Sequence, residues 1–217
     1  MANIDLQAHP HRRFNALSGE WVQVSPHRMQ RPWQGQVDPP AVETRPQHDV
    51  KCYLCPGNER AAGQQNPAYE DVFVFDNDFA ALLDDEPDSQ AATESPLLRA
   101  VPVRGTCRVI CFSPRHDLTL ADMQPQEIEA VIRCWGAQVS ELRQRYRWVQ
   151  VFENKGAIMG CSNPHPHGQI WALDALPNEA LREQSTQATY FAENERTLLR
   201  DYVALECERQ ERIVEAD

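Results

Sequence analysis

The alternation of apolar and polar positions is clearest on either side of a short histidine-containing segment. Two apolar runs, 148–152 and 170–173, are typical of β-strands, and the segment NPHPHGQ at 163–169 lies between them. Side chains two positions apart on an extended chain share a face, so the two histidines and the glutamine are expected to point the same way. The prolines cannot donate backbone hydrogen bonds to a neighbouring strand, so the segment is expected at the edge of a sheet or at the entrance to a strand. A polar turn with incidental histidines is the weaker interpretation.

The same patterning predicts the other elements. Apolar residues at three- and four-residue steps predict a core-facing helix over 125–147. A second helical region is expected over about 178–208. Strands are predicted at 21–24, 72–75, 108–112 and 212–215, the last cut short where the sequence stops, which indicates a truncated chain. Sixteen prolines favour a loop-rich α+β chain over a helical bundle.

Composition and charge exclude several classes of function. The chain has 217 residues, a formal net charge of −11 and no run rich in lysine or arginine. A general nucleic-acid or membrane-surface binder would need a basic patch, so neither partner is expected. The N-terminus lacks an apolar signal core, and a cytoplasmic location is expected. Seven cysteines at irregular spacing fit reduced thiols and a metal site better than a disulfide framework.

A CxxC pair, Cys52 and Cys55, could present two thiolates to one metal ion. Redox dithiols share this spacing, but the following Pro-Gly-Asn predicts a turn and not the start of a helix. Zinc would need two more ligands, and the candidates are His116 and His165. Four protein ligands would make a closed, structural zinc site. His116 alone is equally well a histidine of a surface turn.

Two further groups of residues admit two interpretations each. Arg28 and Arg31 lie in a locally basic stretch and could reach a phosphate or diphosphate, or could simply solvate a loop. Asn77 and Asp78 follow the strand predicted at 72–75. They could be turn residues, or they could hydrogen-bond a ribose or base edge.

Residues 154–156 and 160–171 resemble the signature of the galactose-1-phosphate uridylyltransferase family, the transferase branch of the histidine-triad superfamily. The resemblance extends to 9–13, 25–28, 31–33, the CxxC pair and 77–79, but it covers only the first part of the family's length. It implies a histidine-triad-like, mostly antiparallel sheet (a half-barrel) with flanking helices, the first half of a two-repeat enzyme. The expected domains are a catalytic domain at 1–195, and a helix and first strand at 196–217 leading into an absent second half.

The resemblance also implies roles for individual residues. His167 matches the nucleophile that takes up UMP, and His165, Cys52, Cys55 and His116 match the zinc ligands. Glu183 matches a ligand to a second metal, iron, whose histidine partners lie in the absent half, so little iron is expected in this chain. Nucleotide contacts are implied for Arg28, Arg31, Ala61, Asn77, Asp78, Asn154, Gly160, Cys161, Ser162 and Gln169.

The family reaction exchanges UMP between UDP-glucose and galactose 1-phosphate through a uridylyl-histidine, and full-length members are expected to be homodimers. Gln169 lies where hydrolase relatives have a third histidine. An amide cannot exchange protons as imidazole does, which favours transfer over hydrolysis. Two alternatives stand: a nucleotide hydrolase or phosphorylase of the same superfamily, and a zinc-stabilised binding module without catalysis.

Overall fold

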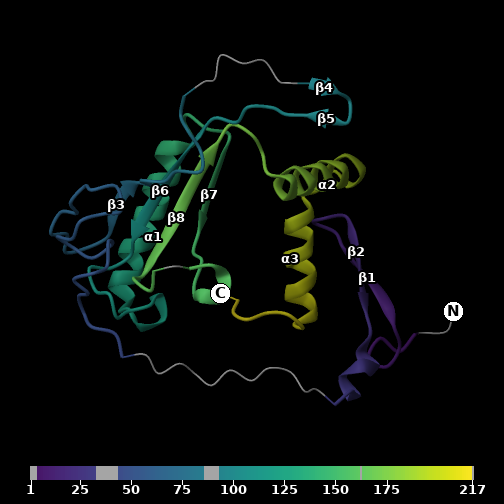
Figure 1. Ribbon diagram of the computed structural model, residues 1–217. Coiled ribbons are helices and arrows are strands. Elements are labelled where there is room, and N and C mark those ends of the chain that lie inside the picture. Colours follow the sequence, from purple (N-terminus) through teal and green to yellow (C-terminus); the bar gives the residue numbers. More distant parts are fainter. Residues whose placement is uncertain (1–3, 33–43, 86–92, 162, 217) are drawn as a thin grey trace. The chain divides into compact units, whose positions relative to one another are not determined.

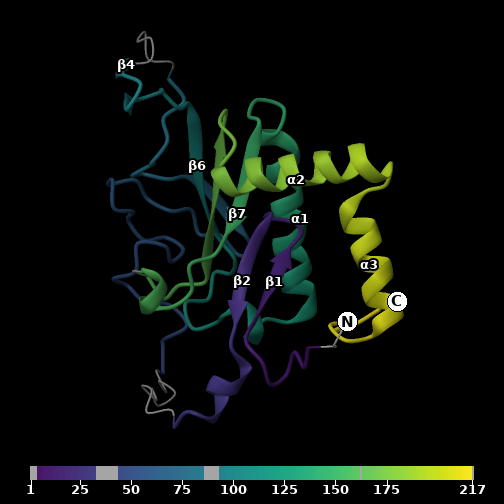
Figure 2. The ribbon, with the colours of Figure 1, turned by 90° about the vertical axis from the view of Figure 1, so that its right-hand side faces the viewer.

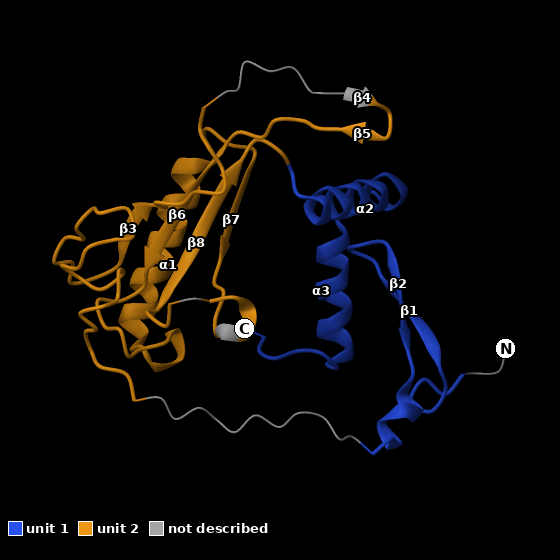
Figure 3. Ribbon diagram, viewed as in Figure 1, with its two compact units in different colours: residues 1–39, 176–217 blue, residues 40–175 orange. Residues whose placement is uncertain are grey.

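The computed structural model describes residues 4–32, 44–85, 93–161 and 163–216. The chain divides into two compact units, which Figure 3 colours separately: Met1–Pro39 with Leu176–Asp217, and Pro40–Ala175. The division falls at 39/40 and 175/176, and the domain boundary expected at 195 stays a prediction. Each unit is described in turn.

The larger unit is built on a four-stranded antiparallel sheet. The strand order is β3-β6-β8-β7, so β8 lies between β6 and β7 (Figure 1). The strands are β3 (Phe73–Asp76), β6 (Gly105–Cys111), β7 (Trp148–Phe152) and β8 (His167–Leu173). Because β8 is hydrogen-bonded on both sides, side chains along it have fixed neighbours.

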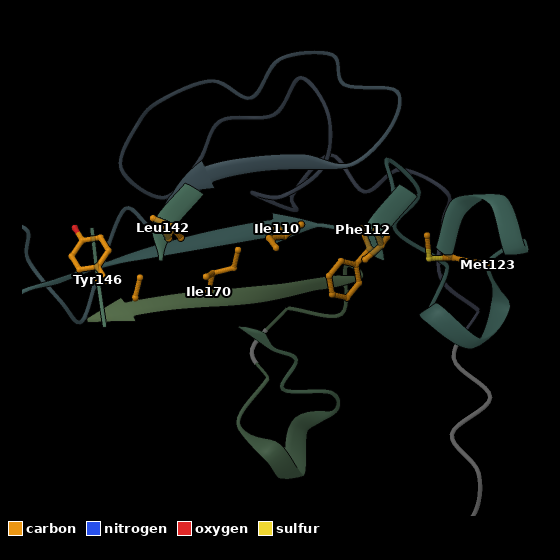
Figure 4. Packing of buried hydrophobic residues seen from close by; sticks show 8 residues of the cluster. Ile110, Phe112, Met123, Leu142, Tyr146 and Ile170 are labelled. Carbon is orange, nitrogen blue, oxygen red and sulfur yellow. The ribbon is translucent and has the colours of Figure 1, made fainter. Parts of the chain in front are cut away.

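One face of this sheet packs against helix α1 (Pro125–Leu142). Buried residues of the helix, Val131 and Leu142, meet Ile110 of β6 and Ile170 of β8 in the main hydrophobic core. Figure 4 shows this cluster, which also includes Phe112 and Met123 beyond the strand. Proline at the first turn and a capping box between Gln124 and Glu127 set the helix start.

The opposite face carries a smaller core. Cys52, Leu54 and Cys55 pack there against Val109 and Cys111 of β6. The aromatic rings of Tyr69, Phe73 and Phe75 are stacked in series beside this core. The turn that carries the CxxC pair is therefore pressed onto the sheet, and the expected turn after Cys55 is present.

The NPHPHGQ segment enters β8 at His167. The prolines precede the strand, as expected for a strand entrance, although β8 itself is an interior strand. His165 was expected to share the strand with His167 and Gln169, but it lies before the first paired residue, because the ladder begins with the pair His167 and Cys111. At Gly168 a Cβ atom would lie 2.8 Å from Phe112 Cζ and 2.9 Å from the Phe152 carbonyl oxygen, so only glycine fits.

The smaller unit combines a hairpin with two helices. Strands β1 (His11–Asn15) and β2 (Glu20–Val24) pair antiparallel and lie side by side in Figures 1 and 2. Helix α2 spans Asn178–Asn194 and helix α3 spans Leu198–Arg209. The hairpin turn is fastened to α2 by the Thr186 hydroxyl, which donates to the Leu17 carbonyl oxygen at 2.5 Å.

The remaining elements are short. Strands β4 (Thr93–Ser95) and β5 (Leu98–Arg99) form a small hairpin. Three 3₁₀ helices are described: η1 (Pro26–Gln30), η2 (Leu120–Asp122) and η3 (Ala157–Met159). Among the residues that the structure describes, no helix is both long and apolar enough to cross a membrane.

The α+β class and the antiparallel sheet are confirmed, and two expected elements need correction. The first helix ends at Leu142 and not at 147, because the N–H groups of Gln144 and Arg145 donate to carbonyls three residues back, on Glu141 and Leu142, instead of four. The strand expected at 212–215 does not form, and Val214 is fully exposed. A strand needs a neighbour for its backbone donors and acceptors, and none of the described residues pairs with this segment.

Candidate active site

Four side chains predicted as metal ligands lie together on the smaller core. The ligand atoms of Cys52, Cys55, His116 and His165 are all within 4.8 Å of one another, and all four residues are buried. Cys55 Sγ lies 3.6 Å from Nδ1 of His116 and 3.6 Å from Nδ1 of His165. Among the described residues this is the cluster that could hold a metal ion.

The geometry of the cluster matches a tetrahedral ion. Bonds of about 2.3 Å to sulfur and about 2.0–2.1 Å to nitrogen, opened to the tetrahedral angle, place S and N about 3.6 Å apart. Burial, and then charge on His116, lower the pKa of His165 to about 4, so its ring is neutral as a ligand must be. Burial raises the pKa of the Cys55 thiol to about 12, so the unmetallated cysteine holds its proton.

Hydrogen bonds fix which nitrogen of His165 faces the cluster. Its Nε2–H points to the Ser113 carbonyl oxygen at 3.0 Å and to the Tyr69 hydroxyl at 3.1 Å, which leaves Nδ1 bare beside Cys55. Burial raises the pKa of Tyr69, and this phenol donates in turn to the Leu54 carbonyl oxygen at 2.5 Å. A metal-bound histidine usually donates its other ring N–H to a carbonyl, carboxylate or hydroxyl oxygen, which fixes the tautomer.

Asn163, which the sequence analysis left without a role, links the cluster to the strand entrance. Its side chain is 4% exposed. Nδ2 lies 3.4 Å from Cys52 Sγ, and Oδ1 accepts the backbone N–H of His165 at 2.9 Å. An amide at this position can donate to a thiolate and at the same time hold the backbone of the next ligand.

The ring of His167 has its protonated nitrogen fixed by the backbone. Nδ1 lies 2.7 Å from the His165 carbonyl oxygen. A carbonyl only accepts, so Nδ1 carries the hydrogen and Nε2 keeps its lone pair. The half-buried ring of His167 is thus hydrogen-bonded directly to His165, a residue of the Cys/His cluster two positions earlier in the chain.

His167 lies where three cavities meet. A cavity of about 520 Å³ lies beside the 153–167 loop, and its wall includes Asn154, Lys155 and Cys161. A second, of about 360 Å³, lies on the side of the sheet that carries the smaller core, and its wall includes Phe75 and Asn77. A third, of about 60 Å³, has Gly160 and Gln169 in its wall. His167 contributes to the wall of each.

Four of the predicted nucleotide contacts line the cavity on the sheet face: Ala61, Asn77, Asp78 and Gln169. Asn77 Oδ1 accepts the backbone N–H of Phe79 at 2.9 Å, as the turn interpretation of this residue requires, and its amide nitrogen has no hydrogen-bond partner among the described residues. Asp78 forms an ion pair with Arg60, at 3.2 Å between Nε and Oδ2.

The loop before β8 collects three more. Asn154 and Cys161 face both the largest and the smallest cavity, and Gly160 faces the smallest. Gly160 has φ = +77°, and a Cβ atom added there would have no neighbour within 4 Å. Glycine is therefore favoured here by the backbone conformation and not by crowding. Ser162 lies outside the described residues.

Three predicted residues belong to the smaller unit and are not placed with this site. Arg28 lies on η1 and Arg31 is its C-cap, and both are exposed. Glu183 is a half-buried residue of α2, and among the described residues it belongs to no group that could hold a metal ion.

Sequence reasoning missed the residues that support the site. Arg60 lies with its guanidinium 4.3 Å from the Phe75 ring centroid, between that ring and Asp78. Trp171 donates its indole N–H to Gln169 Oε1 at 3.2 Å. The alternation along β8 could have indicated Trp171, since it follows His167 and Gln169 at the same two-residue spacing.

Comparisons with known proteins agree with this arrangement. Residues 2–177 match the family model described as galactose-1-phosphate uridyl transferase, N-terminal domain. The chain is 53% identical over 206 residues to the galactose-1-phosphate uridylyltransferase of Haemophilus influenzae, covering 95% of this chain and 59% of the relative. It is 52% identical to that of Rattus norvegicus, covering 95% of this chain and 54% of the relative.

A solved structure shares the fold. The ADP-glucose phosphorylase from Arabidopsis thaliana with bound ADP-glucose superposes with a TM-score of 0.59 at 23% identity, covering 86% of this chain and 56% of that one. The chain thus spans between half and two thirds of the length of these relatives. By its sequence match over most of its length, the chain belongs to the galactose-1-phosphate uridyl transferase family, whose N-terminal domain it contains.

Proposed function

We propose that the protein of which this chain is part transfers UMP between UDP-glucose and galactose 1-phosphate, with His167 as the nucleophile. The observation that carries the proposal is the hydrogen bond between His167 Nδ1 and the His165 carbonyl oxygen. It leaves Nε2 with its lone pair, and the ring borders cavities that could take a nucleoside and a sugar phosphate. The names of relatives at 52–53% identity support the same reaction.

The chemistry divides one displacement into two. The Nε2 lone pair attacks the α-phosphorus of UDP-glucose, a P–N bond forms, and the P–O bond to glucose 1-phosphate breaks with the electron pair leaving on oxygen. The Nδ1 proton stays in its bond to the backbone carbonyl, which stabilises the positive charge that develops on the ring. A phosphate oxygen of galactose 1-phosphate then attacks the same phosphorus and releases His167.

Donors near the ring would stabilise charge on the phosphoryl oxygens. We assign this role to the Gln169 amide and to the segment 160–162, with Asn154 beside the sugar phosphate and Ala61, Asn77 and Asp78 beside the nucleoside. A well-placed donor of this kind is typically worth roughly 2.7–4 kcal/mol in the transition state. Arg28 and Arg31 remain proposed phosphate contacts, and Glu183 a proposed iron ligand of the longer protein.

We also propose that the Cys52, Cys55, His116 and His165 cluster holds zinc. The donor set of two thiolates and two imidazoles and the 3.6 Å spacings support this ion. With four protein ligands the ion would supply no open coordination position, so its contribution would be to fix His165. Through its carbonyl oxygen, His165 then fixes the ring of His167.

The test is a covalent adduct. The purified chain, and the longer protein, would be incubated with UDP-glucose and analysed by peptide mass spectrometry. We expect one UMP on the peptide that contains His167, its loss in His167→Ala and its retention in His9→Gln, a change at an exposed histidine. Adding galactose 1-phosphate should remove the adduct faster than water alone.

The outcomes separate the alternatives. Discharge by water as fast as by galactose 1-phosphate would indicate a hydrolase. UMP binding without any adduct in the longer protein would indicate a binding module and contradict the proposed nucleophile.

A further inference from the structure

The orientation of the Gln169 amide is decided by its neighbour on β8. Oxygen and nitrogen of a glutamine amide are related by a half-turn of χ3, a torsion with a broad and nearly two-fold preference. An indole N–H can only donate, and Trp171 Nε1 lies 3.2 Å from Gln169 Oε1. The amide oxygen of Gln169 therefore accepts the indole N–H of Trp171, and the NH₂ group, with its two donors, points away from the indole.

The indole itself is held firmly. Trp171 pairs with Cys107 of β6 and Gln150 of β7 in the interior of the sheet. Its ring meets that of Phe152 edge-to-face, with 5.7 Å between centroids and 82° between planes. Phe152 is in turn the β7 partner of Gln169, so the three side chains form one packed group.

The two N–H donors of the Gln169 amide lie beside the imidazole ring of His167. Gln169 shares the walls of the 360 Å³ and 60 Å³ cavities with His167. A phosphoryl group on His167 Nε2 would present its oxygens there and would need donors, not an amide oxygen. An amide turned the other way would place a lone pair against an anion.

We propose that Trp171 is a positioning residue, which keeps the Gln169 amide turned so that its N–H groups donate to the phosphoryl oxygens at His167. This inference rests on the proposed uridylyl transfer and adds to it a residue that touches no substrate. It assigns Trp171 a polar role through its N–H in addition to the packing role of its ring.

The experiment uses substitutions that separate the N–H from the ring. Trp171→Phe keeps an aromatic ring and removes the donor, and Gln169→Met removes the amide at similar length. Trp148→Phe is the matched control, because its buried indole N–H on β7 has no hydrogen-bond partner among the described residues. The readouts are the single-turnover rate of UMP-adduct formation from UDP-glucose, and the dissociation constants of UMP and of uridine.

Losing the orienting bond should slow adduct formation about 2- to 10-fold and weaken UMP binding by a similar factor, the range for one neutral hydrogen bond. Uridine binding should be unchanged, as should every readout in Trp148→Phe. In the Gln169→Met background, Trp171→Phe should have no further effect, because no amide remains to be oriented.

An equal effect of Trp171→Phe in both backgrounds, an equal loss of uridine and UMP affinity, or no effect at all would overturn the inference and leave the proposed function intact. UMP binding that follows the expected pattern without any adduct would support the positioning role and contradict the nucleophile. A chain that neither binds UMP nor forms the adduct would overturn both.

Discussion

Arg60 and Asp78 form a nearly buried ion pair beside the sheet-face cavity, to whose wall Asp78 contributes, and the two side chains are 9% and 10% exposed. Removing the cation alone would leave the carboxylate uncompensated. We therefore expect Arg60→Gln to lower the free energy of unfolding by about 3 kcal/mol, measured by urea denaturation. Arg133→Gln removes an exposed partner of Glu129 and should cost less than about 1 kcal/mol. Equal small losses in both variants would show that the Arg60 pair contributes no more than a surface pair.

Gly168 has no room for a methyl group between Phe112 and the Phe152 carbonyl. Gly168→Ala should therefore destabilise the protein by about 1–3 kcal/mol and displace the start of β8. Gly136 in α1 has nothing within 4 Å of a built Cβ, so Gly136→Ala should be neutral or stabilising by up to about 1 kcal/mol. Thermal denaturation of the two variants compares them directly, and a stable Gly168→Ala would contradict the packing argument.

The buried cluster predicts one tightly held zinc ion per chain. Elemental analysis of the purified protein should find it, and removal by a strong chelator should lower the melting temperature and abolish adduct formation together. Cys55→Ser should reproduce both losses, while Cys207→Ser, at an exposed thiol, should change neither. A chain that keeps its melting temperature after complete zinc removal would refute the structural role.

Asn163 is expected to matter for metal affinity without being a ligand. Asn163→Ala removes the donor to Cys52 Sγ and the acceptor for the His165 N–H, and should weaken zinc binding about 10- to 100-fold in a chelator competition. Asn194→Ala, at an exposed asparagine of α2, serves as the control. Unchanged affinity in Asn163→Ala would mean that the cluster is held by its own ligands alone.

Gln169 is the residue expected to favour transfer over hydrolysis. In Gln169→His the adduct should lose UMP to water faster than in the unmodified chain, because imidazole can relay a proton and an amide cannot. Gln169→Met controls for the loss of the amide without adding an ionisable group. Release of UMP is followed by chromatography, and a rate no higher than that of the unmodified chain would be evidence against this explanation.

The sequence could predict those parts of the site that depend on a pattern of neighbouring residues. Proline, glycine and the two-residue spacing placed His167 at the entrance of a strand, and the CxxC turn was recognisable without a partner. The need of zinc for four ligands suggested His116 and His165 as partners of the CxxC pair, and the resemblance to a family favoured that set, because no local pattern reports which loops meet.

What stayed hidden depends on contacts between segments far apart. Arg60 and Asp78 both belong to stretches without periodicity, so neither indicated the other. The group that accepts the hydrogen bond of His167 Nδ1 is the backbone carbonyl of His165, which every residue type has, so no pattern of side chains indicates it. The expected strand at 212–215 had the right composition, but a strand forms only where another strand is available, which composition does not report.

The distance along the chain between the ligands has a consequence for biosynthesis. Cys55 and His165 are 110 positions apart, so at about 5–20 residues per second the ribosome needs roughly 5–20 s to add the second after the first. During that interval Cys52 and Cys55 are present without the histidine that completes the cluster. A metal ion could therefore meet all four proposed ligands only late in synthesis, after His165 has been added.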